Sequence, residues 1–237
     1  MKIGMIGGIG PESTVDYYQR LIKLYQINIS GDDYPEIIIN SINMTAMLKF
    51  VSGQDWDGLI NMLADAVQSL YKAGADLAFI ASNTPHMVFE QVRKTSPIPL
   101  VSIVEAARIE AEKLGLKKVG LLGTLFTMQA SYYQAEINNS GIAVVVPNNG
   151  EQQYIQHKLF SEIERGIFLE ETRNGLLEIV KRLISDESID GIILGCTELP
   201  LILTKDEYGI PFVNTTAIHA QRIFEKYAEL SGVPISH

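Results

Sequence analysis

Cysteine and basic residues are both scarce in this chain of 237 residues. Cys196 is the single cysteine, so no internal disulfide can form, and no group of cysteines and histidines has the spacing of a zinc site. No apolar run approaches the roughly 20 residues of a membrane-spanning helix. The sequence runs from Met1 directly into a strand pattern, without the features of a signal peptide. We therefore expect a cytoplasmic protein without a bound metal.

Lysine and arginine together number 19, against 28 aspartates and glutamates, which gives a formal net charge of −9. The basic residues do not cluster, which argues against nucleic acid or an anionic membrane surface as a partner. A small anionic substrate is still possible, because backbone N–H groups and one or two cations can bind it. The hydrophobic content of 46% is enough for one large domain or two small ones.

A buried strand that ends at the single cysteine organises the chain. The strand contains the apolar residues Ile189, Ile192, Ile193 and Leu194, which are typical of a parallel strand covered on both faces. Gly195 permits a tight turn. Cys196, Thr197 and Glu198 then follow the carboxyl end of the strand, where open α/β sheets bind their ligands.

The first half of the chain contains a matching strand end. Residues 76–81 are followed by Ser82, and the separation of Ser82 from Cys196 equals that of Asp76 from Asp190. Residues 118–124 likewise repeat residues 2–8, and 210–213 repeat 98–101, in the same order. This order indicates an internal duplication, although any two βα units have some likeness.

We therefore predict an α/β fold with two similar parallel-sheet α/β domains, related by pseudo-twofold symmetry, with an active-site cleft between them. The first domain would comprise residues 1–101 and about 214–237, and the second residues 102–213. Strands are expected at 2–8, 36–41, 76–81, 98–101, 118–124, 143–146, 190–195 and 209–213, and helices at 12–26, 57–73, 85–94, 103–114, 128–139, 151–163, 171–185 and 216–230.

Two proton-carrying side chains on opposite faces of one carbon are what stereoinversion requires. Cys196 and Ser82 would be this pair if the matching strand ends face each other. A thiol suits the task, and the helix start after Cys196 should lower its pKa. The alternative is that Cys196 is a small buried apolar residue.

The loop Gly7–Gly10 lacks the dinucleotide-binding pattern and more closely fits a loop whose N–H groups face a carboxylate.

Three segments resemble the signature motifs of the aspartate/glutamate racemase family, in order and spacing over almost the whole chain: Gly7-Gly8-Ile9-Gly10-Pro11-Glu12-Ser13-Thr14, Ser82-Asn83-Thr84-Pro85-His86 and Gly195-Cys196-Thr197-Glu198. The resemblance implies amino-acid racemisation without a cofactor, in a protein that is commonly a dimer, with aspartate or glutamate as the default substrate. It makes Cys196 the second catalytic thiol. It also implies that Asn83, Thr84 and Thr197 hold the substrate's carboxylate and amine, and that Gly8, Ile9 and Gly10 form the first loop of the site.

The chain departs from the family pattern at Ser82, where the usual motif has cysteine. A hydroxyl is a far weaker acid than a thiol, so it cannot be a stored base at neutral pH. Ser82 could act as a proton donor only. The protein could instead be a single-thiol decarboxylase or isomerase of a small diacid. Ser82 could also be an engineered replacement of a cysteine, or the protein could bind a small molecule without turnover.

The residues that would recognise the substrate side chain are a second departure. Family members with acidic substrates use basic residues near two positions that are Leu48 and Glu164 here, with Lys49 and Arg165 beside them. Arg165 could bind the substrate, or both cations could be solvated surface, and Asn43 could line a pocket for a neutral side chain. Glu198 could orient Cys196 or cap the following helix.

Overall fold

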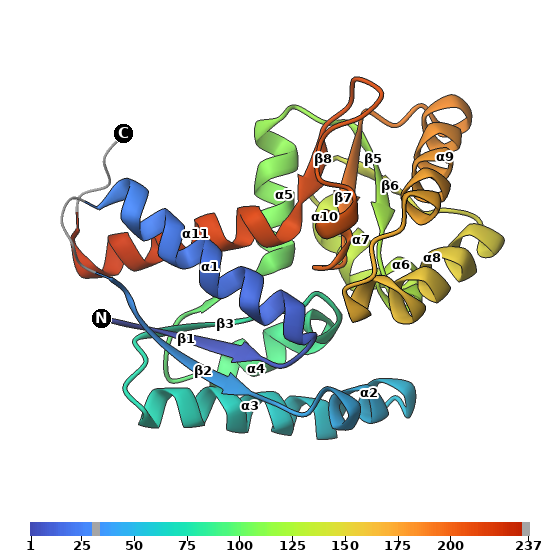
Figure 1. Cartoon of the computed structure of the whole chain (residues 1–237). Helices are drawn as coiled ribbons and strands as arrows, with labels where there is room; N and C mark the ends of the chain where they lie inside the picture. Colours follow the sequence, from blue (N-terminus) through green and yellow to red (C-terminus); the bar gives the residue numbers. More distant parts are fainter. Residues whose placement is uncertain (30–33, 234–237) are drawn as a thin grey trace. The chain divides into compact units, whose positions relative to one another are not determined.

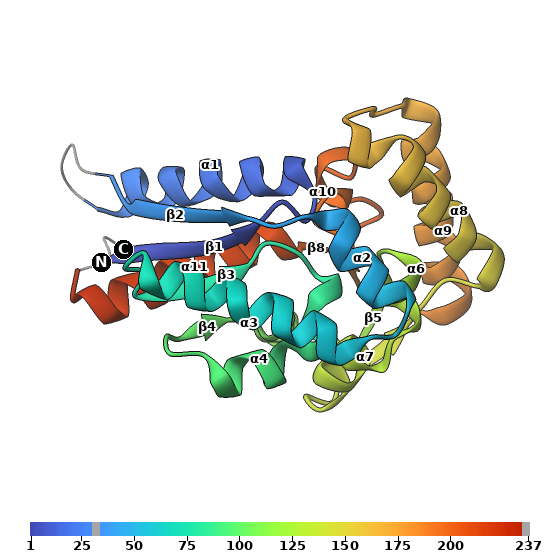
Figure 2. The ribbon, with the colours of Figure 1, turned by 90° about the horizontal axis from the view of Figure 1, so that it is seen from below.

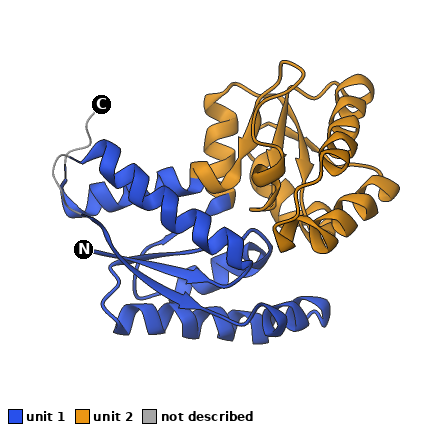
Figure 3. Ribbon diagram, viewed as in Figure 1, with its two compact units in different colours: residues 1–103, 219–237 blue, residues 104–218 orange. Residues whose placement is uncertain are grey.

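The computed structural model describes residues 1–29 and 34–233, and it divides into two compact units (Figure 3). Unit 1 consists of Met1–Ile103 and His219–His237, and unit 2 of Val104–Ile218. The predicted domain boundaries near residues 101 and 214 stay a prediction. No helix of the described residues is long and apolar enough to span a bilayer.

Unit 1 contains a parallel sheet with the strand order β2-β1-β3-β4 (Figure 1). Its strands are β1 (Lys2–Gly7), β2 (Glu36–Ser41), β3 (Leu77–Ile80) and β4 (Leu100–Val101). Its helices are α1 (Pro11–Asn28), α2 (Met44–Ser52), α3 (Trp56–Lys72), the 3-10 helix η1 (Thr84–Val88), α4 (Phe89–Thr95) and most of α11 (Thr215–Ser231).

The two faces of this sheet follow the alternation of side chains along β1. Ile3 and Met5 pack with α1 and α11 on one face. Gly4 points to the other face, where an added Cβ would lie 3.1 Å from Leu70 of α3. Figure 2 shows α2 and α3 in front of this face of the sheet. The glycine therefore allows α3 to approach the strands closely.

A buried histidine ties α11 to the sheet of unit 1. His219 Nε2 lies 3.0 Å from the carbonyl oxygen of Val101, and its Nδ1 lies 2.7 Å from the hydroxyl of Tyr17. Because the carbonyl can only accept, Nε2 carries the proton and Nδ1 accepts from Tyr17. Burial lowers the pKa of His219 to about 3, so the ring is neutral and has a structural role.

Unit 2 repeats the architecture, with the parallel order β6-β5-β7-β8. Its strands are β5 (Lys118–Leu122), β6 (Ala143–Val145), β7 (Gly191–Leu194) and β8 (Phe212–Asn214). Helices α8 and α9 share one apolar core with β7. The helical elements are α5 (Ile103–Lys113, of which Ile103 belongs to unit 1), α6 (Leu125–Gln129), α7 (Ser131–Asn138), α8 (Asn149–Ser161), η2 (Ile163–Arg165), α9 (Glu170–Glu187) and α10 (Leu199–Ile202).

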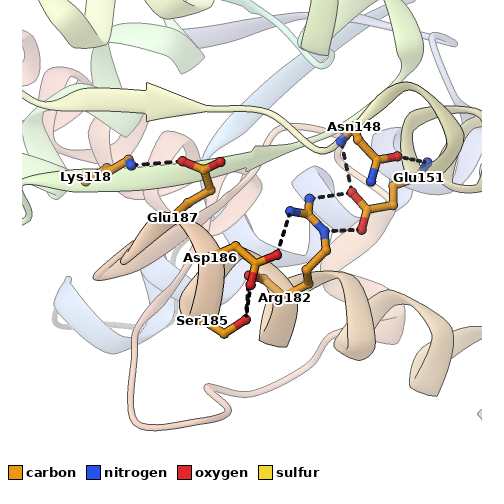
Figure 4. Close-up of polar contacts among 7 residues, drawn as sticks. All are labelled: Lys118, Asn148, Glu151, Arg182, Ser185, Asp186 and Glu187. Atoms are coloured by element: carbon orange, nitrogen blue, oxygen red, sulfur yellow. Dashed lines mark hydrogen bonds and ion pairs between the residues drawn. The ribbon is translucent and has the colours of Figure 1, made fainter.

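Polar contacts fix the start of α8 against α9 (Figure 4). The side chain of Asn148 accepts from the N–H of Glu151, and the Glu151 carboxylate accepts from the N–H of Asn148, which is a capping box. The same carboxylate binds the guanidinium of Arg182 from α9 through both oxygens. One glutamate therefore caps a helix and joins two helices.

The two units share more than strand order. In unit 1 the carboxylate of Asp76 accepts from the N–H of Lys2 at 2.7 Å, and in unit 2 that of Asp190 accepts from the N–H of Lys118 at 3.0 Å. Each aspartate precedes the third strand of its sheet. The prediction of two similar parallel-sheet α/β units is thus confirmed, whereas the symmetry axis and the cleft stay predictions.

Several expected elements differ in detail. Helix α2 was not predicted, and Asn43 caps it by accepting from the N–H of Ala46 at 3.0 Å. The single helix expected at 128–139 is two helices, because Ala130 has an extended backbone with φ −77° and ψ 140°. The helix expected at 85–94 begins as the 3-10 turn η1. In each case the difference from the expected element depends on a local backbone conformation that the spacing of apolar residues does not reveal.

Candidate active site

The glycine loop after β1 has a geometry that only glycine can adopt at one position. Gly8 has φ +79°, and an added Cβ would lie 2.5 Å from the carbonyl oxygen of Ile42. The N–H of Gly8 donates to the hydroxyl of Thr14 at 2.8 Å. That N–H therefore stabilises the loop itself. The assignment of Gly8, Ile9 and Gly10 to substrate binding stays a prediction.

The turn after β3 buries Ser82, Asn83 and Thr84. The ring of His86 supports this turn, because its Nε2 accepts from the N–H of Ile103 at 3.2 Å. The proton must then sit on Nδ1. This nitrogen has no well-aligned hydrogen bond, but the nearby carbonyl of Ser82 favours a proton there. Burial lowers the pKa of His86. The neutral ring thus connects the Ser82 turn to the end of β4.

The turn after β7 places two donors on one carboxylate oxygen. Cys196 Sγ donates to Oε2 of Glu198 at 3.1 Å, and the hydroxyl of Thr197 donates to the same oxygen at 2.9 Å. All three side chains are buried. The backbone is closely packed at Gly195, where an added Cβ would lie 2.7 Å from the side chain of Leu121 and 3.1 Å from the carbonyl oxygen of Leu122. Glu198 therefore orients Cys196, which was one of its two expected roles.

The pKa of Cys196 corrects the expectation drawn from the sequence. Burial raises it well above the ordinary value, and the negative charge of Glu198 raises it further. The expected lowering by a helix start does not occur, because α10 begins only at Leu199 and is four residues long. The charge that acts on the Cys196 sulfur is instead the negative charge of the Glu198 carboxylate, which disfavours the thiolate. At neutral pH the thiol is protonated and is placed to donate a proton.

A second carboxylate, that of Glu164, reaches this thiol; its position is the one near which family members with acidic substrates have a basic residue. Glu164 of η2, Cys196 and Glu198 bring one oxygen, the sulfur and one oxygen within 4.8 Å of one another. Burial, followed by the charge of Glu198, raises the pKa of Glu164 to about 7. These donors could surround a cation, although a metal ion would require the thiol to lose its proton.

The remaining predicted binding residues are at the surface or already bonded. Arg165 is exposed, and its neighbour Glu164 is the residue of this turn that lies near the thiol. Lys49 is exposed on α2. The oxygen of Asn43 caps α2, as described above. The family resemblance pointed to the position of Glu164, but the residue expected to bind the substrate there was its neighbour Arg165.

Comparisons with known proteins show that the chain is similar in sequence and fold to racemases. Residues 6–223 match the model of the family described as Asp/Glu/Hydantoin racemase. A broad-specificity amino-acid racemase from Bacillus subtilis is 28% identical over 232 residues, which cover 95% of this chain and 97% of that protein. The crystal structure of an aspartate racemase homologue from Pyrococcus horikoshii is 36% identical, with a TM-score of 0.82 over 96% of this chain and 99% of the other. An aspartate racemase from Picrophilus torridus, at 19% identity and a TM-score of 0.74 over 99% of this chain and 96% of the other, shares the fold.

Proposed function

We propose that this chain, which belongs to the Asp/Glu/hydantoin racemase family, is an amino-acid racemase that works without a cofactor. Family membership makes it an isomerase. The observation that carries the mechanism is the buried, protonated thiol of Cys196, hydrogen-bonded to Glu198 at the carboxyl end of β7. Aspartate and glutamate are the default substrates.

Cys196 acts on one face of the α-carbon, in both directions of proton transfer. As a thiol it delivers its proton to the carbanion and becomes a thiolate. In the other direction it must first lose its proton, and Oε2 of Glu198 is the acceptor within hydrogen-bonding distance. The thiolate so formed takes the α-proton, and the Glu198 proton passes to water. Glu198 is thus a positioning residue and a proton acceptor for the thiol.

The proposal assigns the other face of the α-carbon to Ser82. Its position in the turn after β3 corresponds to that of Cys196 after β7. A hydroxyl can give its proton to the strongly basic carbanion and regain one from water, but it is too weak an acid to be held as the anion that would remove an α-proton. The enzyme should therefore work faster in the direction in which Cys196 removes the proton and Ser82 supplies one. Asn83, Thr84 and Thr197 are the proposed contacts of the substrate's polar groups.

Proton exchange in D₂O tests the function directly. Each enantiomer of several amino acids is incubated with the protein, and loss of the α-proton signal is followed by NMR. We expect exchange in wild type and none in Cys196→Ala. If no enantiomer of any amino acid exchanges, the protein is not a racemase.

Ser82 itself favours a second candidate, a single-thiol decarboxylase or isomerase of a small diacid. Such an enzyme would release CO₂ or isomerise a double bond and leave amino acids unchanged. A protein that only binds would instead be stabilised by a ligand without turnover. We also propose a cytoplasmic homodimer, as the family resemblance implies. The net charge of −9 supports the absence of nucleic-acid and anionic-membrane partners.

A further inference from the structure

We propose that His86 is a positioning residue for Ser82, and that it acts through a hydrogen bond from its Nδ1–H to the carbonyl oxygen of Ser82. This inference rests on the proposed function and deepens it, because it adds a residue on which only one of the two proton transfers depends. Loss of His86 should slow inversion of the α-carbon, which needs Ser82. Removal of the α-proton by Cys196 should be unaffected.

The first step of the argument is the fixed orientation of the His86 ring. The ring is buried and stacks on Phe89, with the centroids 4.7 Å apart and an interplanar angle of 9°. The ring of His219 meets it edge-on at 6.3 Å. The N–H of Ile103 donates to Nε2 at 3.2 Å, so the proton of the neutral ring is on Nδ1. These contacts leave the ring one donor, with a fixed direction.

The second step is the acceptor for that donor. Within residues 1–29 and 34–233, Nδ1 of His86 has no well-aligned hydrogen bond. The carbonyl oxygen of Ser82 is the nearby acceptor that favours a proton on the ring. A buried donor without a full hydrogen bond is costly. The turn is therefore stabilised when the Ser82 carbonyl comes into line with Nδ1.

The third step is the place of Ser82 between two anchored carbonyl groups. The buried hydroxyl of Ser13, on α1, donates to the carbonyl oxygen of Ala81 at 3.0 Å. His86 acts on the next carbonyl along the chain, that of Ser82. The Cα of Ser82 lies between these two carbonyl groups, so holding both sets the direction of its side chain. Among the residues that the structure describes, no side chain forms a hydrogen bond with the Ser82 hydroxyl itself.

The turn after β7 is held in a different way. There the hydrogen bond from Sγ to Glu198 orients Cys196 directly. His86 lies four places after Ser82, whereas the residue four places after Cys196 is Pro200, and proline has no side-chain donor. Support by an imidazole is therefore specific to the Ser82 turn, and removing it should affect one proton transfer only.

The test measures two rates in one sample. Each enantiomer of alanine and aspartate is incubated in D₂O, where loss of the α-proton signal gives the rate of exchange and chiral chromatography gives the rate of inversion. The enantiomer that Cys196 acts on is the one that still exchanges in Ser82→Ala. For that enantiomer, the ratio of inversion to exchange does not depend on how much of the enzyme is folded.

Three substitutions separate the two contacts of the ring. In His86→Asn the amide can replace Nδ1 and donate to Ser82, whereas in His86→Gln it reaches the place of Nε2 and can accept from Ile103. His86→Leu forms neither bond. We expect the ratio to fall about 3- to 10-fold in His86→Leu and His86→Gln, the effect of one hydrogen bond, and to stay near wild type in His86→Asn. The control His157→Leu, at an exposed position of α8, should behave as wild type.

A second measurement does not depend on turnover. Nitrogen chemical shifts measured by NMR distinguish the protonated from the unprotonated nitrogen of a neutral imidazole. The signals of His86 are those that disappear in His86→Asn. We expect them to place the proton on Nδ1.

Four results would count against these assignments. An unchanged ratio in His86→Leu would show that the ring does not position Ser82. Rescue by His86→Gln and not by His86→Asn would assign its role to Ile103. A proton on Nε2 would overturn the hydrogen bond to Ser82, whatever the activity. If wild type exchanges no amino acid, the racemase proposal fails and this inference fails with it.

Discussion

Replacing Glu164 by glutamine should make the protein more stable above neutral pH. The reason is the cost of keeping this carboxylate ionised beside Glu198. Burial and that neighbouring charge raise the pKa of Glu164 from its ordinary 4.5 to about 7. A raised folded-state pKa means that protonation favours the folded protein. The favourable contribution is complete below pH 4.5, declines as the pH rises, and is lost above about pH 7.

The magnitude follows from the same pKa values. A rise from 4.5 to about 7 corresponds to about 3.4 kcal/mol, at about 1.36 kcal/mol per pKa unit. Because the side chain is only partly buried, solvent screening reduces this to about 1–2 kcal/mol. Glutamine has nearly the same shape and is neutral at every pH. At pH 8 the variant should therefore melt about 3–6 °C above wild type.

Thermal unfolding followed by circular dichroism at pH 4.5, 6 and 8 measures this difference. We expect the Tm values of wild type and Glu164→Gln to converge at pH 4.5 and to separate steadily up to pH 8. The control Glu178→Gln should follow wild type throughout, because its carboxylate is in solvent. Equal Tm values for wild type and Glu164→Gln at pH 8, or a gap that does not depend on pH, would refute the electrostatic reasoning.

Three further predictions concern other positions. Glu198→Gln should lower the pKa of Cys196, and iodoacetamide should then alkylate this single cysteine several-fold faster at pH 8; an unchanged rate contradicts the assigned cause. Ser82→Cys should speed α-proton exchange in the slower direction at least about tenfold, unless residue 82 lies away from the reacting carbon. Gly8→Ala should lower the free energy of unfolding by more than about 2 kcal/mol in urea titration, and a smaller loss would contradict the contact with Ile42.

These predictions differ in how much they owe to the tertiary structure. The roles of Cys196 and Ser82 were derived from repeated strand ends, and the structure adds the partners and the protonation state of the thiol. The sequence pointed to position 164 through the family resemblance, but the distance of Glu164 from the thiol and its raised pKa could not be predicted from it. The expected binding residue in that turn was Arg165, which is exposed. A turn residue gives no periodic signal, so which of two neighbours faces the site depends on packing.

The sequence by itself determined the duplicated α/β architecture and the strand end that carries Cys196. Short apolar runs, glycine turns and a repeated order of segments are local properties, and they specify strands and their ends before any packing is known. The tertiary structure alone decided that the carboxylate of Glu164 joins that of Glu198 beside the thiol and that the pKa of Cys196 is raised. A pKa depends on burial and on charges brought close in space, and Glu164 and Cys196 become neighbours only when η2 packs beside β7.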